Sequence, residues 1–510
     1  LIVLVITIIV IIILAAAVIL TLNKNNPIKN ANKASFQQDL DSFKSDLDLT
    51  HSQKIAGTVG EYDISGENVN VGDEVEMKKM IPSISSKYAK ILGIEQGKLV
   101  VSKSVSKEQL EWSKEIQVNP EIFVVGKDGA NIPVFPTANG KPNTDVKAVK
   151  WNGVVEQTYT TMPTDEWYKY EAQSTTTQNG GTSKWANMQT KDGSYFVWIP
   201  RYAYKITSGW HTSTAGTIDV KLMKGASDTE CSDGSKLPSD YKIHDAFTFD
   251  GKSVPGIWVA KYEASNSFDK VKVVPNVTSW RNITHKNIFD KCISMQTDKE
   301  TYGWEINNAH MMKSNEWGCV AYFTHSQYGR NGTEVTINNN SAYITGIAGD
   351  SISAIENTST TNSYNTDKGK LASTTGNIYG IYDMSGGAWE YISGNLKGYP
   401  GMYSWTNELI DANAKYFNMY IPSENPENLK DNYEANKDLS VARGDAICDT
   451  SSSGDDNTSW FEDYSYFLDS KASLSLYGGS YASRISAGMF TFGNRNGESS
   501  TYFSFRPVIF

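Results

Sequence analysis

The strongest hydrophobic pattern lies at the start of the chain. From Leu1 to Leu22 only Thr7 and Thr21 interrupt an apolar run. At about 1.5 Å per residue, a helix of this length extends roughly 33 Å, which is enough to cross the hydrocarbon core of a bilayer. A helix this apolar must be buried, either in lipid or among copies of itself.

A helix break and an amphipathic segment follow the apolar run. Asn26 and Pro27 predict that a new helix begins here, because asparagine caps helices and proline is favoured in their first turn. Beyond this break, apolar and small side chains recur at spacings of mostly three and four residues, at Ile28, Ala31, Ser35, Phe36, Leu40, Phe43 and Leu47. Residues 1–54 are therefore predicted to form one long helical segment, apolar at first and amphipathic later.

This N-terminus resembles the processed start of type IV pilins and pseudopilins. The resemblance implies a homopolymeric cell-surface pilus, a prepilin peptidase, a pilus assembly machinery and membrane insertion before assembly. It implies that the first 22 residues form the filament core and the membrane segment, with these positions contributing: Leu1, Ile2, Val3, Leu4, Val5, Ile8, Ile12, Leu14, Ile19 and Leu22.

One feature departs from the pilin pattern. Pilins usually carry a glutamate near the start of the apolar run, whereas Leu1–Leu22 contains no acidic residue and Val3 or Val5 takes that place. Loss of the carboxylate removes both a costly buried charge and a device that sets subunit register. A single-pass membrane anchor would show the same lack. A membrane-anchored surface adhesin or receptor that does not polymerise is therefore the alternative.

Three further segments follow the N-terminal helix. Residues 55–125 mix short strand-like runs with a helical pattern at Lys107–Ile116, which predicts a small α/β module packed on the stem. This module is similar to small heads of Gram-positive pilin-like proteins, which implies a Gram-positive cell surface. Residues 126–193 are predicted to form a β-rich connector, and residues 194–510 a large β-rich domain. The fold class expected for the whole chain is α+β.

The large domain begins with aromatic and β-branched runs that predict strands at Tyr195–Tyr202 and Gly256–Glu263. The clearest helical pattern within it is at Lys313–Tyr322. Five blocks in order resemble the formylglycine-generating-enzyme-like branch of the C-type lectin fold: Trp258–Glu263, Asn315–Tyr322, Asn377–Met384 with Gly386–Tyr391, Tyr477–Tyr481 and Phe505–Pro507. Glu390 and Arg506 in these blocks need hydrogen-bond partners if they are buried.

The catalytic residues of that family are missing. Its enzymes use two cysteines that bind copper, and their positions fall on Ser483 and Gly488. A hydroxyl and a hydrogen cannot replace thiolates in a soft-metal site, so we expect no enzyme activity of this kind. The calcium site of the family loses its asparagine to Gly387, although Ala388 and Glu390 could still offer oxygen ligands for calcium. No other cofactor is expected.

Charge and cysteine content narrow the remaining possibilities. The 510-residue chain has a net charge of −10 and no visible basic stripe, which argues against nucleic acid as a partner. The four cysteines, Cys231, Cys292, Cys319 and Cys448, are widely spaced and show no CxxC pair. Disulfides in an extracellular domain and free buried thiols both remain open, and the sequence does not fix a pairing.

The remaining candidate for function is a binding surface on the C-terminal strands and loops. Aromatic faces mixed with hydrogen-bonding groups suit an extracellular glycan or protein ligand, and six residues are the candidates: Trp460, Tyr464, Tyr481, Arg484, Asn494 and Arg495. Each aromatic residue among them could instead belong to the core. The sequence thus predicts a pilus subunit that carries a catalytically silent binding domain.

Overall fold

The computed structural model describes most of the C-terminal part of the chain, residues 181–304, 308–350, 362–437 and 444–510. Before residue 181 it describes short stretches only: 29, 31–36, 38–39, 92–95, 98–101, 106, 108–109, 112, 121–124, 133, 145–151, 155–157 and 167–173. The chain divides into two compact units, Leu1–Gly126 and Lys127–Phe510. The predicted filament core in Leu1–Leu22 and the helix break at Asn26 and Pro27 lie outside the described residues.

The first unit contains helical residues and a small sheet. Residues 31–36 and 38–39 are helical, and most of the helical segment predicted over residues 1–54 lies outside the described residues. Phe36 on this helix packs against Trp112, with ring centroids 6.4 Å apart and both side chains buried. Three strands form an antiparallel sheet in the order β1-β2-β3: Leu92–Glu95, Lys98–Val101 and Glu121–Val124. Among the described residues, no helix is long and apolar enough to cross a membrane.

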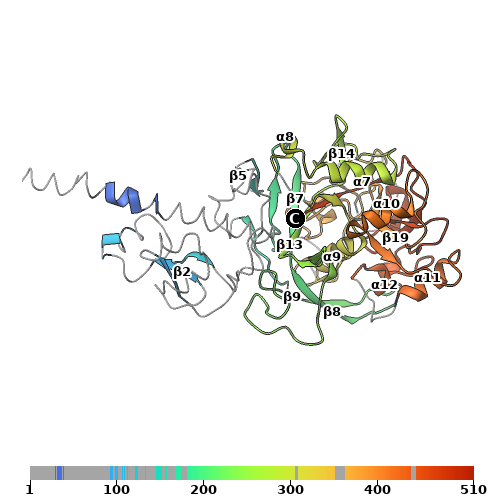
Figure 1. Cartoon of the computed structure of the whole chain (residues 1–510), viewed down its shortest axis with the longest axis horizontal. Helices are drawn as coiled ribbons and strands as arrows, with labels where there is room; N and C mark the ends of the chain where they lie inside the picture. The colour runs from blue at the N-terminus through green and yellow to red at the C-terminus, as the bar shows by residue number, and fades with distance from the viewer. Residues whose placement is uncertain are drawn as a thin grey trace, which may run out of the picture. The chain divides into compact units, whose positions relative to one another are not determined.

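The second unit is built around a seven-stranded antiparallel sheet (Figure 1). In spatial order its strands are β16 (His310–Met311), β24 (Pro507–Ile509), β13 (Gly256–Ala260), β7 (Tyr195–Pro200), β6 (Asn187–Gln189), β4 (Lys147–Lys150) and β5 (Val155–Gln157). The segment that we expected to be a connector, residues 126–193, therefore supplies three strands of the main sheet. The C-terminal strand β24 pairs with β13 near the centre of the sheet.

The central strands are buried on both faces, which explains their continuous apolar sequences. Phe196 and Trp198 of β7 belong to one hydrophobic core, whereas Val197 and Ile199 belong to the other. Successive side chains of a strand point to opposite faces, so one apolar run fills two cores. Trp198 and Trp258 sit opposite each other on paired strands, with ring centroids 5.2 Å apart.

One long helix covers each face of the sheet. Helix α7 (His285–Ser294) contributes Ile288 and Phe289 to the first core, and its N-terminus is capped by the Thr284 hydroxyl, which accepts a hydrogen bond from Asn287 N at 3.3 Å. Helix α9 (Ser314–His325) contributes to the second core and is buried at every position. The strands predicted at Tyr195–Tyr202 and Gly256–Glu263 and the helix predicted at Lys313–Tyr322 are present, although β7 ends at Pro200, β13 ends at Ala260 and α9 extends to His325.

A second sheet carries the C-terminal part of the fold. Its strands are β20 (Asn418–Tyr420), β19 (Trp389–Leu396), β21 (Leu474–Tyr477) and β22 (Phe492–Arg495), with β23 (Phe503–Ser504) paired to β19. Smaller sheets join β8 (Tyr202–Ser208) with β9 (Thr217–Leu222) and β10 (Lys242–Ile243), and form the pairs β11 (Thr248–Phe249) with β12 (Lys252–Ser253), β14 (Ser265–Ser267) with β15 (Lys270–Lys272), and β17 (Ile347–Ala348) with β18 (Asn362–Ser363).

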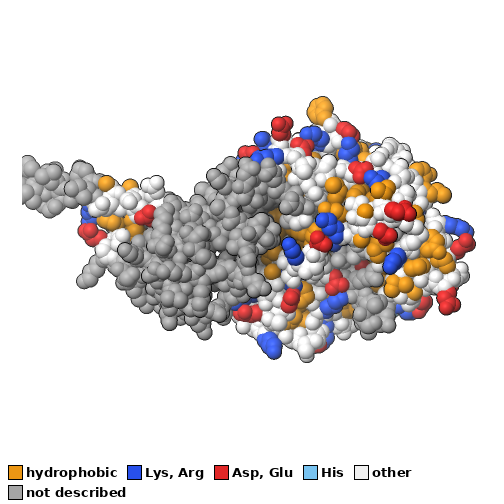
Figure 2. Space-filling view, viewed as in Figure 1, with side chains coloured by type: hydrophobic (Ala, Val, Ile, Leu, Met, Phe, Trp, Pro, Cys, Tyr) orange, Lys and Arg blue, Asp and Glu red, His pale blue; other side chains and the backbone are white. Residues whose placement is uncertain are grey.

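Short helices complete the second unit. They are α8 (Lys299–Tyr302), α10 (Asn407–Ala412), α11 (Leu429–Asn436) and α12 (Ile447–Thr450), together with the 3-10 turns η1 (Asp245–Phe247), η2 (Gly369–Ala372), η3 (Ala414–Tyr416), η5 (Trp460–Glu462) and η6 (Tyr481–Ser486). The described chain is thus a mixture of helix and strand in which strands dominate. On the face shown in Figure 2, positive and negative side chains are interspersed over this unit.

Candidate functional site

The sequence blocks of the large domain meet at a buried ion pair. Arg506 and Glu390 are both fully buried, and the guanidinium contacts both carboxylate oxygens, with Arg506 Nε 2.7 Å from Glu390 Oε2. Arg506 also donates to the carbonyls of Ala260 at 3.0 Å and Tyr382 at 3.1 Å. Both buried side chains therefore have partners: Arg506 and Glu390 bind each other, and Arg506 also binds two backbone carbonyls.

This ion pair argues against the calcium site that we considered at Ala388 and Glu390. Both oxygens of Glu390 are engaged by Arg506, so a cation would have to displace the guanidinium. The backbone N–H of Ala388 donates to Glu263 Oε1 at 2.8 Å. The Glu263 carboxylate is therefore bound to this peptide group and not to a metal. Across the described residues, no group of three or more His, Cys, Asp or Glu is arranged to hold a metal ion.

Gly387 occupies the position where the resembled family has its calcium-site asparagine, and the backbone and its neighbours require a glycine there. Its φ is +71°, and a Cβ at this position would lie 2.4 Å from Glu263 Oε1. A side chain here would collide with a buried carboxyl group. Burial raises the pKa of Glu263 well above its usual range, and the nearby carboxylates of Asp383 and Glu390 raise it further.

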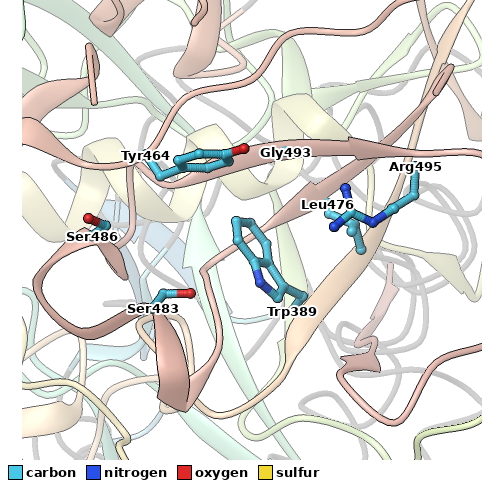
Figure 3. A pocket seen from close by; sticks show the side chains of 7 residues that line it. All are labelled: Trp389, Tyr464, Leu476, Ser483, Ser486, Gly493 and Arg495. Atoms are coloured by element: carbon cyan, nitrogen blue, oxygen red, sulfur yellow. The ribbon is translucent and has the colours of Figure 1, made fainter. Parts of the chain in front are cut away.

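An open pocket of about 270 Å³ lies on the second sheet. Strands β19, β21 and β22 supply Trp389, Leu476, Gly493 and Arg495. Ser483 and Ser486 come from η6, and Tyr464 comes from the loop between η5 and β21. Figure 3 shows the Trp389 ring pointing toward the Tyr464 ring, with the two serines on one side and Arg495 on the other. Two parts of the chain, at residue 389 and within residues 464–495, thus form one cavity.

Aromatic rings form the walls of this pocket. Trp389 and Tyr464 meet edge to face, with centroids 6.1 Å apart and an interplanar angle of 74°. Tyr464 also stacks on Tyr466 at 5.0 Å. Gly493 leaves room for the indole, since a Cβ there would lie 3.3 Å from Trp389 Cζ3. The aromatic walls are therefore held by packing with their neighbours before any ligand binds.

Polar groups line the rest of the pocket. Ser483 Oγ accepts a hydrogen bond from the backbone N–H of Ser480 at 3.0 Å, which holds the first turn of η6. Arg495 is half-exposed; its Nη1 donates to the Asn494 carbonyl at 2.7 Å, and its Nε lies 3.7 Å from Glu498. Burial raises the pKa of Tyr464, while the charge of Arg495 opposes that rise. The Tyr464 hydroxyl thus stays protonated and can donate a hydrogen bond.

This arrangement suits binding of a small, partly polar ligand. Ligand sites are typically concave, mostly apolar, and provided with a few polar groups that fix orientation. The pocket offers flat aromatic faces, three hydroxyl groups and one guanidinium, all of them side chains that can bind a hydroxyl-rich ring without a metal.

The six predicted surface residues separate into three groups. Tyr464 and Arg495 line the pocket. Tyr481 and Arg484 lie on η6, the same turn that supplies the two serines. Two are placed inside the protein and do not belong to a surface: Trp460 is fully buried and donates to the Gly209 carbonyl at 2.7 Å, and Asn494 is buried and donates to the Phe467 carbonyl at 2.7 Å.

Sequence reasoning missed most of the pocket lining. Trp389 was interpreted as a structural residue of its glycine-rich block, and Leu476, Ser486 and Gly493 carried no signal of their own. Ser483 had a signal, because it occupies a copper-cysteine position of the resembled family, and it does line the cavity. The second such position, Gly488, is closed off, since a Cβ there would lie 2.0 Å from Asp463 Oδ2.

The four cysteines are all buried, and within the described chain none of them forms a disulfide. Burial raises the pKa of the Cys292 and Cys319 thiols well above the usual range. The sequence left open either disulfides or free buried thiols, and the structure shows free buried thiols.

No protein-family model and no curated protein matches the chain. Among solved structures, it shows a weak likeness to a protein titled Major Tropism Determinant M1 Variant, with 13% sequence identity and a TM-score of 0.27, over 81% of this chain and 91% of that one.

Proposed function

We propose that this chain is a subunit of a type IV pilus-like surface filament and that its large domain, of the C-type lectin kind, is a non-catalytic adhesion domain. The apolar N-terminus and the helical residues 31–36 and 38–39 support the pilin part of the proposal. The five sequence blocks support the domain type. The partners proposed are other copies of the chain, the assembly machinery and prepilin peptidase, the membrane before assembly, and an extracellular ligand.

One observation carries the adhesive role, namely the pocket between Trp389, Tyr464 and Arg495. It is concave, aromatic and open to solvent, and its polar groups converge from one turn and one strand. Ser483 in its wall and Gly488 beside the buried Asp463 replace the copper ligands of the resembled enzymes. Binding without chemistry is the function that these residues support best.

The second candidate is a membrane-anchored adhesin that does not polymerise. It is favoured by the absence of an acidic residue in Leu1–Leu22, since a plain anchor needs no register-setting charge. The adhesion domain would act in the same way in both cases.

The proposal is tested in cells that produce this chain and in the same cells carrying Trp389→Ala. Sheared surface material is imaged for filaments labelled by an antibody to the large domain, and adherence of the cells is measured. We expect labelled filaments from both strains and roughly tenfold weaker adherence with Trp389→Ala, as is typical when a central aromatic contact is truncated. Ile421→Ala, which removes an exposed apolar side chain that does not line the pocket, is the control.

Two outcomes would count against the proposal. Chain found solely as detergent-extracted monomers, with no labelled filaments, would replace the pilus with the anchored adhesin. Adherence that is unchanged by Trp389→Ala would remove the pocket from the adhesive role altogether.

A further inference from the structure

A second aromatic cluster lies beside the pocket. Tyr343 packs edge to face against Tyr481, with centroids 4.9 Å apart, and against Tyr502, with centroids 6.2 Å apart. The Arg281 guanidinium covers the Tyr343 ring at 3.9 Å. Tyr343 is buried, whereas Tyr502 is 46% exposed. We call Tyr343, Tyr481 and Tyr502 the tyrosine cluster.

Two elements join the tyrosine cluster to the pocket. The backbone N–H of Trp389 donates to the Tyr502 carbonyl at 2.9 Å, so the backbone at residue 502 lies beside that of Trp389. Tyr481 begins η6, whose Ser483 and Ser486 line the pocket. The tyrosine cluster and the pocket are therefore joined through the backbone at residue 502 and through η6.

The surface around this junction is unusual in its exposed side chains. Ile485 on η6 is 59% exposed, and it lies between Arg484 and the pocket residue Ser486. Arg495 in the pocket and Arg484 on η6 are both exposed. The acidic groups near the pocket are Glu498, 3.7 Å from Arg495 Nε, and Asp455 and Asp456, whose charges act on Tyr464.

The strand edge beside the pocket is partly occupied. The outer edge of β22 is paired at its first residue, because Phe492 N donates to the Tyr464 carbonyl at 2.8 Å and Tyr466 N donates to the Phe492 carbonyl at 2.9 Å, which shortens the edge open to a peptide. A peptide that binds by adding a strand needs a free edge. A sugar ring needs an aromatic face and side-chain hydroxyls, both of which the pocket supplies.

We propose that the pocket and the tyrosine cluster together bind one acidic oligosaccharide. One sugar ring lies against Trp389 and Tyr464, with its hydroxyls toward the η6 serines and its carboxylate toward Arg495. The next ring extends over Tyr502 and Tyr481. A carboxylate strengthens the contact because a charge-assisted hydrogen bond to guanidinium is about twice as strong as a neutral one. This proposal rests on the adhesive role proposed above and names its ligand.

The test measures binding of the full chain, held in detergent because of its apolar N-terminus, to a panel of oligosaccharides. The panel holds sialic-acid-terminated and uronic-acid sugars of one to four rings, and the same sugars with each carboxylate reduced to an alcohol. We expect four-ring acidic sugars to bind about tenfold more tightly than one-ring sugars. We also expect carboxyl reduction to weaken binding about tenfold.

Three variants assign the effects to residues. Tyr502→Ala should weaken binding of the four-ring sugars and leave the one-ring sugars unchanged. Arg495→Gln should remove the preference for the carboxylate over its reduced form. Trp389→Ala should weaken every sugar, and Ile421→Ala should change none.

The outcomes also separate this inference from the proposed function. Equal binding of one-ring and four-ring sugars, equal binding of acidic and reduced sugars, or no binding on the whole panel would each overturn the acidic oligosaccharide. If the panel is negative and Trp389→Ala still weakens cell adherence about tenfold, the adhesive pocket stands and its ligand is of another class. If adherence is unchanged by Trp389→Ala, the adhesive role itself fails.

Discussion

Charged side chains inside the second unit are held by partners that are distant in sequence. Arg506 is bound by Glu390, 116 residues away, and by carbonyls from two other segments. Removing one member of a buried pair leaves an uncompensated charge, which typically costs about 3–5 kcal/mol. The carboxyl groups of the partly buried Glu334 and the fully buried Asp463 have no such cation among the described residues: burial raises the pKa of each above its usual range, and the charge of Glu334 raises that of Asp463 further.

The pH dependence of stability follows from Glu334. Burial raises its pKa to about 8, so the folded protein holds a proton that the unfolded chain releases at a lower pH. The free energy of unfolding should therefore fall as the pH rises from about 5 to 8, because the folded state binds more protons in this range. Glu334→Gln should flatten this fall by on the order of 1–2 kcal/mol, measured as denaturant midpoints at several pH values. Glu300→Gln, at an exposed position, is the control. An unchanged pH slope in Glu334→Gln would contradict the assignment.

At the scale of elements, the pocket depends on how three strands place their side chains. Gly493 on β22 pairs with Leu476 on β21, and Leu476 pairs with Tyr391 on β19. The Trp389 ring reaches over this row as far as Gly493. The position of the indole thus depends on a glycine, Gly493, two strands away.

Gly493→Ala tests this placement. The new methyl group would lie 3.3 Å from Trp389 Cζ3, which forces the half-buried indole to shift by a few tenths of an ångström. We expect adherence to weaken several-fold while the free energy of unfolding falls by about 1 kcal/mol, at the low end for overpacking, because the ring has room to move. Adherence equal to that of the unmodified chain would show that the indole position is not important for binding.

At the scale of the whole molecule, the second unit stays folded without covalent cross-links among its described residues. Two cores on opposite faces of one sheet, with a helix on each, supply the burial that small extracellular domains often replace with disulfides. The four cysteines are part of these cores and their surroundings.

The reactivity of the four thiols in the intact chain tests whether they are buried and free of disulfides. A thiol reagent such as dithionitrobenzoate should react with none of the four cysteines in the native protein and with all four in guanidinium chloride without reductant. The reason is that each thiol is buried until the unit unfolds globally. Fewer than four reactive thiols after unfolding would indicate a disulfide and contradict the structure.

The sequence alone determined the elements whose pattern is strong and local. The aromatic runs of β7 and β13 and the helical pattern of α9 predicted these elements correctly, because side-chain period and residue type follow from the backbone itself. The sequence also showed that Glu390 and Arg506 would need partners if buried. The apolar N-terminus and its break remain predictions, since they lie outside the described residues.

The tertiary structure alone decided which aromatic residues form a site. Trp460 and Trp389 are the same residue type, yet the first is enclosed in a core and the second forms the wall of a pocket. Local sequence cannot distinguish them, because exposure depends on which distant strands lie beside each ring. Trp389 lines a pocket because β19, β21 and β22 pair and η6 lies beside them. The same arrangement brings Trp389, Tyr464 and Arg495 together.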